Sequence, residues 1–388
     1  MSIVDPLPRS LGPAPTKTAI NVRFMRYNEL LALVPRWETL IDRCPWRNPC
    51  YEPEFLLSLL RAIDIGSVRV MVAERGNELV GLMPIATKQQ FHLPIRIAET
   101  WRPDEAFDAT PLLDSFWAGD ALQACFKSLR RHGFHLLSLN TVSANPEFVS
   151  VFQTATTATS LAYFTRDQFQ RAALRPAGGA EEYFQRVLSK NRRKKFSRAL
   201  KSLESRGTVR FETAAVPAQA RDWMEVFLDL EASGWKGNAS TAFASEDDSL
   251  SFFLDMIGRL IDSEKLHITR LTVNRNPIAM LIDIRSADHV ACYKTAFDER
   301  YSQYSPGALL EWHNVRRMFD QGVSLCDSCG DPDNELLNAL YNERLDFQHL
   351  IVSLDRWTNF IPKRVLPALQ WIKRRLPSQR GNESTPKG

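Results

Sequence analysis

Apolar positions in the first half of the chain recur at two different spacings. A spacing of three to four residues is typical of helices that bury one face, and a spacing of two is typical of half-buried strands. Arg75-Gly-Asn-Glu78 lies between two strand-like runs and has the composition of a hairpin turn. The pattern predicts helices at 28–43, 53–63, 118–132 and 145–155, and strands at 68–73, 79–85, 91–98, 134–139 and 161–170.

The second half repeats this order of elements. Ser245-Glu-Asp-Asp248 has the composition of a capping box and predicts the start of a helix. Gly322 suits the C-cap of a later helix. Because the two halves share their order of elements, they indicate an internal duplication and a mixed α/β fold. The remaining pattern predicts helices at 180–206, 217–233 and 308–321, and strands at 209–213, 267–273, 278–284, 290–297 and 323–327.

Length and composition support a folded protein of two or three domains. The chain has 388 residues, of which 44% are apolar and 24% are charged, and these values exclude wholesale disorder. Residues 1–18 are Pro-rich and aperiodic and are expected to form a disordered leader. The Pro and Gly residues within 171–180 mark a boundary. They predict an N-terminal domain at 19–172 and a C-terminal domain at 173–355.

Positive charge gathers in the tail, residues 356–388. The whole chain carries +4, but the tail holds eight Lys and Arg against one acid, interspersed with Trp, Phe, Ile and Leu. This basic amphipathic segment suits either a helix lying on anionic lipid or one packed on the domain. No apolar run is long enough to span a bilayer, and the N-terminus lacks a secretory pattern. We expect a cytoplasmic protein, which would be peripheral to the inner face of the membrane if the tail lies on lipid.

The six cysteines favour neither a disulfide framework nor a metal site. Their spacing is irregular, which suits a reducing compartment. Cys326-Asp-Ser-Cys329 is a lone C-x-x-C pair, and no second Cys/His pair follows it to complete a zinc site. We therefore expect no metal.

The loop after the strand at 290–297 is the strongest candidate site. In the run Tyr301-Ser-Gln-Tyr-Ser-Pro-Gly-Ala-Leu-Leu310, Pro306 and Gly307 stand at a helix start, where unsatisfied amides and a partial positive charge favour an anion. Pro306 costs little in a first turn, and Gly307 lets a ligand approach the backbone. A pyrophosphate would suit this site. The alternative is an ordinary helix start without a ligand.

The order of these features resembles a known fold. An antiparallel meander, an anion loop, a helix and a further strand follow one another as in the GNAT acyl-CoA fold. Gln303-Tyr-Ser-Pro-Gly-Ala308 resembles its Q/R-x-x-G-x-G/A loop, with Pro306 where the first Gly is usual. Glu231-Ala-Ser-Gly-Trp-Lys-Gly237, Thr241-Ala-Phe243 and Tyr293-Lys294 narrow the resemblance to tandem-GNAT proteins of the CelD/BcsL type, relatives of the Fem aminoacyltransferases. It implies tandem GNAT-like domains that use acetyl-CoA or another acyl-CoA.

The resemblance also implies where the chemistry would take place. In the GNAT fold the thioester lies between the strands that correspond here to 290–297 and 323–327. Tyr293 would then protonate the leaving thiolate and Asp327 would act as base, with Lys294 beside them. Because side chains alternate along a strand, Tyr293 and Lys294 are expected on opposite faces, so that only one of them would enter the site.

Two groups of binding residues complete this hypothesis. An aromatic ring next to a cation suits a sugar or an anionic acceptor. The residues expected to bind the acceptor are Glu231, Trp235, Lys236 and Thr241. The residues expected to bind the cofactor are Gln303, Tyr304, Ser305, Pro306, Gly307, Ala308 and Leu309.

The N-terminal half lacks an anion loop. At the corresponding place stands Thr100-Trp-Arg-Pro-Asp-Glu-Ala-Phe107, which has two acids and no Gly. Acids would repel a pyrophosphate. We expect this half to be degenerate and to shape an acceptor cleft where the halves meet.

A basic stretch opens the second half. Seven bases and no acid lie between residues 190 and 201, above an apolar stripe that includes Phe196 and Leu203. It suits either a packed helix with a solvated face or a dock for an anion such as the 3′-phosphate of CoA, an acidic glycan or RNA. Since no recognised nucleic-acid-binding module is present, we expect no DNA partner.

Together these features predict an acyl-CoA-dependent N- or O-acetyltransferase of cellulose or exopolysaccharide production. An amine or hydroxyl on a small-molecule or glycan acceptor would attack the thioester directly, because the sequence offers no Cys or Ser nucleophile constellation. One alternative is a Fem-like, tRNA-dependent aminoacyltransferase that uses the basic helix for RNA. The other is a non-catalytic adaptor of an exopolysaccharide complex. Since the tandem halves could replace a dimer, we expect either a monomer or a dimer.

Overall fold

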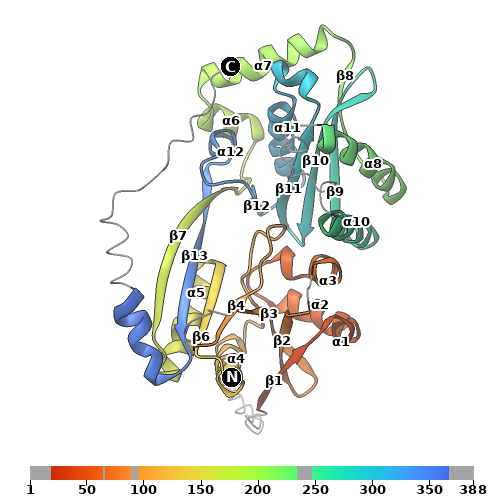
Figure 1. Cartoon of the computed structure of the whole chain (residues 1–388). Coiled ribbons are helices and arrows are strands. Elements are labelled where there is room, and N and C mark those ends of the chain that lie inside the picture. The colour runs from red at the N-terminus through yellow and green to blue at the C-terminus, as the bar shows by residue number, and fades with distance from the viewer. Residues whose placement is uncertain (1–18, 64–65, 89–94, 234–246, 367–388) are drawn as a thin grey trace, which may run out of the picture.

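The structure is a computed structural model that describes residues 19–63, 66–88, 95–233 and 247–366 (Figure 1). Within these ranges thirteen strands form one continuous mixed sheet, with helices packed on its faces. The expected leader, Ser245 of the expected capping box and residues 367–388 of the tail lie outside the described residues.

In the N-terminal half, the observed helices and strands agree best with the prediction where apolar residues recur at regular spacing. The helix predicted at 118–132 is α4, and the predicted hairpin is β2–β3. The short strands β1 and β5 were not predicted. The elements are β1 (Ile20–Met25), α1 (Tyr27–Leu30), η1 (Leu31–Leu33), α2 (Val34–Arg43), η2 (Pro49–Tyr51), α3 (Pro53–Ala62), β2 (Arg69–Arg75), β3 (Glu78–Lys88), β4 (Ile97–Thr100), β5 (Leu112–Leu113), α4 (Ala118–Arg131), β6 (Leu136–Ser143), α5 (Pro146–Thr159) and β7 (Tyr163–Leu174).

In the C-terminal half, the single helix predicted for 180–206 is wrong. Leu188 is extended, and Ser189 starts a second helix by accepting a hydrogen bond from the Arg192 amide at 3.2 Å, so the chain breaks there. Neither α12 nor β13 was predicted. The elements are α6 (Ala180–Val187), α7 (Lys190–Glu204), β8 (Val209–Thr213), α8 (Pro217–Ser233), α10 (Asp247–Asp262), β9 (Leu266–Val273), β10 (Asn276–Ser286), β11 (His289–Phe297), η4 (Glu299–Tyr304), α11 (Pro306–Asp320), β12 (Leu325–Asp327), α12 (Glu335–Leu340), β13 (Glu343–Ser353), η5 (Arg356–Asn359) and η6 (Ile361–Val365).

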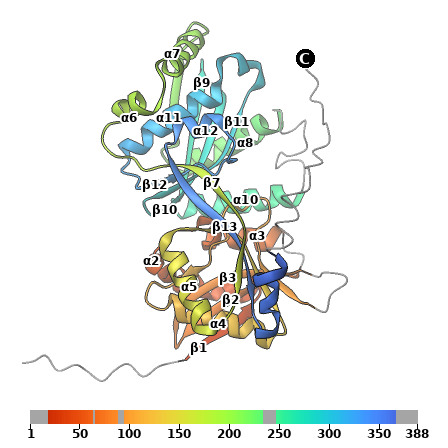
Figure 2. The same ribbon diagram turned by 90° about the vertical axis from the view of Figure 1, so that its left-hand side faces the viewer.

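The last strand of each half pairs with a strand of the other half. The sheet order is β1-β2-β3-β4-β6-β13-β7-β12-β11-β10-β9-β8, with β5 beside β3. β13, the last strand of the C-terminal half, pairs with β6, and β7, the last strand of the N-terminal half, pairs with β12. Figure 2 shows these two long strands running between the halves. The domain boundary proposed at 172/173 therefore falls in a strand that belongs to the sheet of both halves.

Ion pairs and helix packing also join the halves. Helix α3 of the N-terminal half packs against α10 of the C-terminal half. The Lys265 ammonium lies 2.9 Å from the carboxylates of both Glu52 and Glu54, which are buried. A half-buried cation between two buried carboxylates costs more to separate than an exposed pair, and this contact helps to hold the halves in one relative orientation.

Candidate functional site

The central strands of the C-terminal half separate in the middle of the sheet. β11 and β12 pair in parallel over three residues, from His289 opposite Leu325 to Ala291 opposite Asp327. β12 then ends, whereas β11 continues to Phe297. Among the residues that the structure describes, no strand pairs with the backbone of β11 beyond Ala291 on its β12 side, and we call this opening the splay.

A β-bulge lies on β11 at the start of the splay. Cys292 pairs with Asp283 and Lys294 pairs with Ile282, which leaves Tyr293 as the extra residue. Because a bulge shifts the alternation by one position, Tyr293 and Lys294 both face the side of α8 and α10. The prediction that they lie on opposite faces is wrong for this reason.

Both side chains already have protein partners. The Tyr293 hydroxyl donates to the Glu105 carbonyl oxygen at 3.3 Å, and its ring packs edge-on to Phe55. Burial raises the pKa of Tyr293 well above its usual value, so the phenol stays protonated near neutrality. Lys294 Nζ lies 3.0 Å from Glu231 Oε1 on α8. The expected acceptor residue Glu231 is thus a buried ion-pair partner of the expected catalytic Lys294.

Asp327 is held by a buried arginine from the other half. Arg171 Nε and Nη2 lie 2.8 Å and 2.5 Å from the two oxygens of Asp327, and Arg171 also donates to the Phe107 carbonyl oxygen at 3.0 Å. The Asp327 Oδ1 accepts a further bond from the Cys329 amide at 2.9 Å. With both oxygens bound to a guanidinium, this carboxylate ties β7 to β12 at the base of the splay.

The expected anion loop forms the start of α11. Ser305 is in the left-handed conformation at φ 51° and its side chain makes no cap bond. The amides of the first turn therefore lack a side-chain acceptor, and those of Gly307 and Ala308 are the ones a ligand could use. A Cβ on Gly307 would lie 3.3 Å from the Phe297 ring, so glycine also permits close packing there.

The side chains of this loop divide into two groups. Those of Tyr304, Pro306 and Leu309 are buried in the core, and the Tyr304 hydroxyl accepts a bond from Arg206 Nε at 2.9 Å. The Gln303 side chain is exposed. In this loop the backbone amides are suited to bind an anion, whereas the side chains buried in the core are not.

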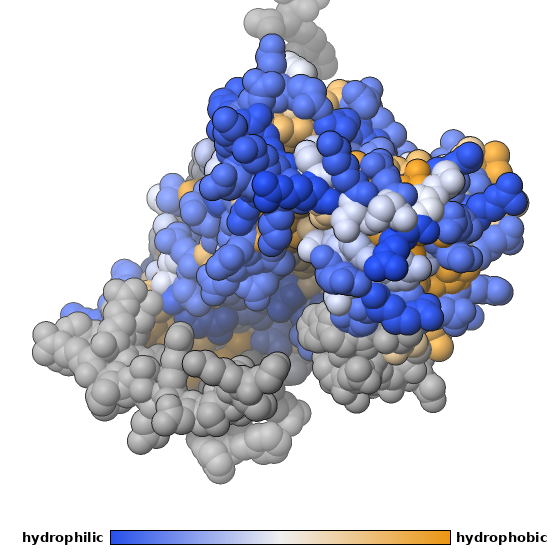
Figure 3. Space-filling view, turned by 90° about the horizontal axis from the view of Figure 1, so that it is seen from above, coloured by the Kyte–Doolittle hydropathy of each residue, from blue (hydrophilic) through white to orange (hydrophobic). Residues whose placement is uncertain are grey.

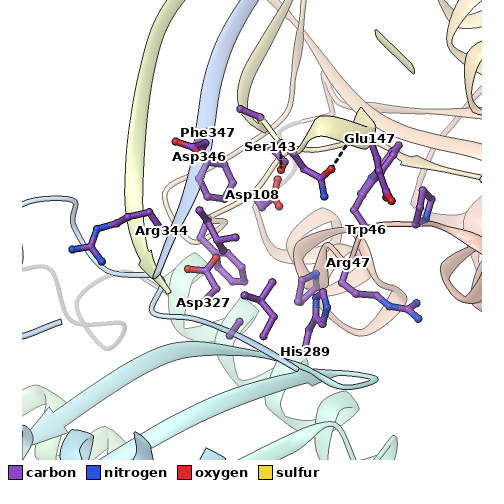
Figure 4. A pocket seen from close by; sticks show the side chains of 18 of the residues that line it. Trp46, Arg47, Asp108, Ser143, Glu147, His289, Asp327, Arg344, Asp346 and Phe347 are labelled. Atoms are coloured by element: carbon purple, nitrogen blue, oxygen red, sulfur yellow. Dashed lines mark hydrogen bonds between the residues drawn. The ribbon is translucent and has the colours of Figure 1, made fainter. Parts of the chain in front are cut away.

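A cavity of about 540 Å³ lies where the halves meet (Figure 4). Its walls include Ala291 and Asp327 from the base of the splay, and Phe107 and Asp108 from the N-terminal half. The sequence predicted a cleft at this junction but did not single out Asp108. The only hint in the neighbouring sequence is the run Asp108-Ala-Thr110. Asp and Thr side chains often hydrogen-bond to neighbouring backbone in turns, so this run indicates a turn rather than a catalytic group.

Comparison with known proteins identifies part of the chain. Residues 190–335 match the family described as Acetyltransferase (GNAT) domain.

This stretch forms a GNAT acetyltransferase domain.

It makes the chain an acyltransferase, and the splay and the α11 loop both lie within the GNAT domain. A search of curated proteins found no significant relative.

Solved structures share the fold of most of the chain. FemX is 9% identical with a TM-score of 0.55, over 90% of this chain and 100% of FemX. The C-terminal domain of a putative lysylphosphatidylglycerol synthetase from Agrobacterium fabrum is 14% identical with a TM-score of 0.51, over 88% of this chain and 96% of that chain. At such identities the likeness concerns the fold alone. The predicted mixed α/β fold is confirmed.

The remaining expected acceptor residues are Trp235, Lys236 and Thr241. All three lie outside the described residues. No helix in the described part of the chain is long and apolar enough to cross a membrane.

The basic surface of the GNAT domain lies beside the α11 loop. Helix α7 contacts both η4 and α11, and Figure 3, seen from the α7 end, shows this face as mostly hydrophilic. The apolar side chains Phe196 and Leu203 anchor the helix in the core. The polar side chains along its outer surface are Lys190, Arg193, Lys194, Ser197, Arg198 and Lys201.

A buried polar cluster lies beneath α11. Tyr341 donates to Glu311, and Arg317 pairs with Asp283. Cys292 Sγ lies 3.4 Å from Cys326 Sγ, so the thiol of Cys326 contacts a cysteine of the neighbouring strand β11. Glu311 is buried, and the resulting desolvation of its carboxylate raises its pKa to about 7.

Glu311 is expected to make stability depend on pH. Its pKa rises from 4.5 to about 7 on folding, so the folded state holds a proton that the unfolded state releases between these values. Stability therefore falls as pH rises through this window, and the loss is complete above about 7. At 1.36 kcal/mol per pKa unit, Glu311→Gln should be on the order of 3 kcal/mol more stable than wild type at pH 8 and nearly equal at pH 5.

Urea unfolding at pH 5 and pH 8 measures this difference. The exposed Glu335→Gln on α12 is the matched control, and because it keeps Glu311 its stability should fall between pH 5 and pH 8 as that of the wild type does. Equal pH dependence in the wild type and Glu311→Gln would contradict the prediction.

Proposed function

We propose that the protein transfers an acyl group from acyl-CoA to an amine or a hydroxyl. The observation that carries this proposal is the splay of β11 and β12, followed by a helix start whose first-turn amides have no side-chain cap. Laid along β11, an acyl-CoA would bring its phosphates to Gly307 and Ala308, where the amides and the helix dipole favour negative charge. The bases of α7 lie beside this loop and would suit the 3′-phosphate.

The reaction we propose is direct attack. The acceptor nitrogen or oxygen forms a bond to the thioester carbon, the carbon–sulfur bond breaks, and CoA leaves as a thiolate that takes up a proton. Tyr293 is a protonated phenol near the splay and could supply that proton. The hydrogen bond with Cys326, together with burial, raises the pKa of Cys292 well above its usual value, and burial does the same for Cys329, which favours neutral thiols over nucleophilic thiolates. This supports a mechanism without a covalent enzyme intermediate.

For the acceptor we propose a glycan or small molecule of cellulose or exopolysaccharide production, on the CelD/BcsL resemblance. Calorimetric titration of acetyl-CoA and of CoA at two salt concentrations tests the acyl-CoA step. We expect saturable binding that weakens with salt, because phosphate contacts are partly screened. Absence of binding would move support to tRNA-dependent aminoacyl transfer or to a non-catalytic adaptor, neither of which needs CoA.

For localisation we propose peripheral contact with an anionic bilayer through the C-terminal segment 356–366. Trp357, Phe360 and Val365 are 57%, 50% and 38% exposed, although large apolar side chains are usually covered. Ile361 packs with Ile97 and Leu136 and fixes the segment to the sheet.

Charge on the same segment favours anionic lipid. Arg356, Lys363 and Arg364 are exposed, and segment 356–366 contains no acid. Aromatic side chains with interspersed bases are the combination that binds the bilayer interface.

The double variant Trp357→Ser/Phe360→Ser should bind phosphatidylglycerol-containing vesicles at least about tenfold more weakly than wild type, given roughly 1.5–3 kcal/mol for each buried large side chain. Vesicle co-sedimentation measures this. Phe116→Ser removes another exposed ring, 80% exposed, far from the segment in sequence and should not change binding. Equal binding to pure phosphatidylcholine vesicles, or no loss in the double variant, would count against a membrane role.

A further inference from the structure

The acid–base side chains expected near the splay are all engaged with the protein. Tyr293 donates to a backbone carbonyl, and Lys294 and Asp327 are in ion pairs. A base for the acceptor must have a free oxygen or nitrogen that faces the acceptor. Asp327 is the only carboxylate of the three, and both of its oxygens are held by Arg171.

Asp108 has such an oxygen. Its side chain is 7% exposed and lines the cavity between the halves. Oδ1 accepts bonds from the Thr110 amide at 2.7 Å and the Thr110 hydroxyl at 2.6 Å, which fixes the carboxylate. Oδ2 accepts none of the hydrogen bonds found among the described residues. Figure 4 shows Asp108 in the cavity wall, with Asp327 and His289 on the opposite side in this view.

The cavity extends from Asp108 to the base of the splay. Ala291 and Asp327 line the same cavity, and they are the last paired residues before β11 and β12 separate. Phe107 also lines it and contacts the Tyr293 ring, with centroids 6.3 Å apart. A molecule in the cavity would therefore lie between Asp108 and the place where we put the thioester.

We propose that Asp108, a residue of the half without an anion loop, is the general base of acyl transfer. This inference rests on the proposed function. Asp108 Oδ2 takes the proton from the attacking amine or hydroxyl as the new bond to the acyl carbon forms and the carbon–sulfur bond breaks. The N-terminal half thus supplies a catalytic group, while the GNAT domain holds the acyl donor.

The electrostatics of the site suit this role. Burial raises the pKa of Asp108 to about 6, against the lowering effect of Thr110 and Arg171. The ionised, active form is therefore dominant only above about pH 6, and activity should rise with pH through that value.

Affinity labelling tests the geometry without knowledge of the natural acceptor. In Asp108→Cys, the thiol should be alkylated by bromoacetyl-CoA, with loss of bromide, and excess CoA should block the reaction. Asp104→Cys places a thiol at an exposed position of the same loop and should not be labelled in a CoA-protected manner. Peptide mass spectrometry locates the label against the wild-type background.

A pH profile provides the second measurement. Thiol release from acetyl-CoA is followed with glucosamine or water as acceptor. Asp108→Asn keeps an oxygen for the Thr110 bonds and should lower kcat/KM about 100-fold or more, while removing the rise near pH 6. Asp104→Asn should keep both the rate and the profile.

The outcomes separate this inference from the proposed function. If Asp108→Cys binds acetyl-CoA but is not labelled, Asp108 is not the base, although acyl-CoA dependence stands. If the wild type does not bind acetyl-CoA, the proposed function falls and this inference falls with it. Should Asp108→Cys fail to fold, the pH profile of Asp108→Asn decides, and an unchanged profile overturns the assignment.

Discussion

Replacing Gly307 with Asp should weaken acetyl-CoA binding by about 100-fold or more. The substitution places a negative charge in the first turn of α11, where we put the pyrophosphate. Two unit charges about 4 Å apart interact with about 4 kcal/mol at an effective dielectric constant of about 20, and about 1.4 kcal/mol corresponds to a factor of ten in affinity. The new Cβ would also lie 3.3 Å from the Phe297 ring and narrow the approach.

The fold itself should tolerate this change. An acid in the first turn of a helix is favoured by the helix dipole, so lost binding would not reflect general unfolding. Gly119→Asp is a matched control, because Gly119 is also the second residue of a helix, α4, and a Cβ added there would meet no other atom within 4 Å. Calorimetry with acetyl-CoA measures both variants. Binding that persists in Gly307→Asp would show that the phosphates lie elsewhere.

Arg171→Met should lower the free energy of unfolding by about 3–5 kcal/mol. The Arg171 side chain is 5% exposed and binds both oxygens of Asp327, whose side chain is 14% exposed. Removal of the guanidinium leaves a largely buried carboxylate without its cation and the Phe107 carbonyl without a donor. Since β7 and β12 belong to different halves, the loss affects the junction beside the splay.

Urea unfolding measures this loss, and a double variant identifies its cause. Adding Asp327→Asn to Arg171→Met should recover part of the stability, because the uncompensated charge is gone. Arg221→Met is the control, since Arg221 and Asp262 form a pair that is 52% and 71% exposed, and such pairs contribute about 0–1 kcal/mol. A similar effect of Arg171→Met and Arg221→Met would refute a special role for the buried pair.

The local pattern of apolar and polar residues was sufficient to predict many of the helices and strands of this protein. The sequence predicted a helix at 118–132 where α4 spans Ala118–Arg131, and a strand at 290–297 where β11 spans His289–Phe297. It also placed a helix start around Pro306 and Gly307. These features depend on periodic burial and on the conformational preferences of Pro and Gly, which act over a few neighbouring residues. The break at Ser189 is equally local but was missed, because the apolar stripe continues through it.

Features that depend on partners far along the chain needed the tertiary structure. Asp327 looked like a free base, but its partner Arg171 is 156 residues away on an exchanged strand. The bulge at Tyr293 arises from the register of β11 against β10, which no single-strand pattern contains. Asp108 shares a cavity with Ala291 and Asp327 because the two halves share one sheet. The sequence by itself determined many of the helices and strands and the helix start at Pro306 and Gly307. The tertiary structure decided which charged groups are neutralised and which remain available, because burial and pairing depend on how distant segments meet.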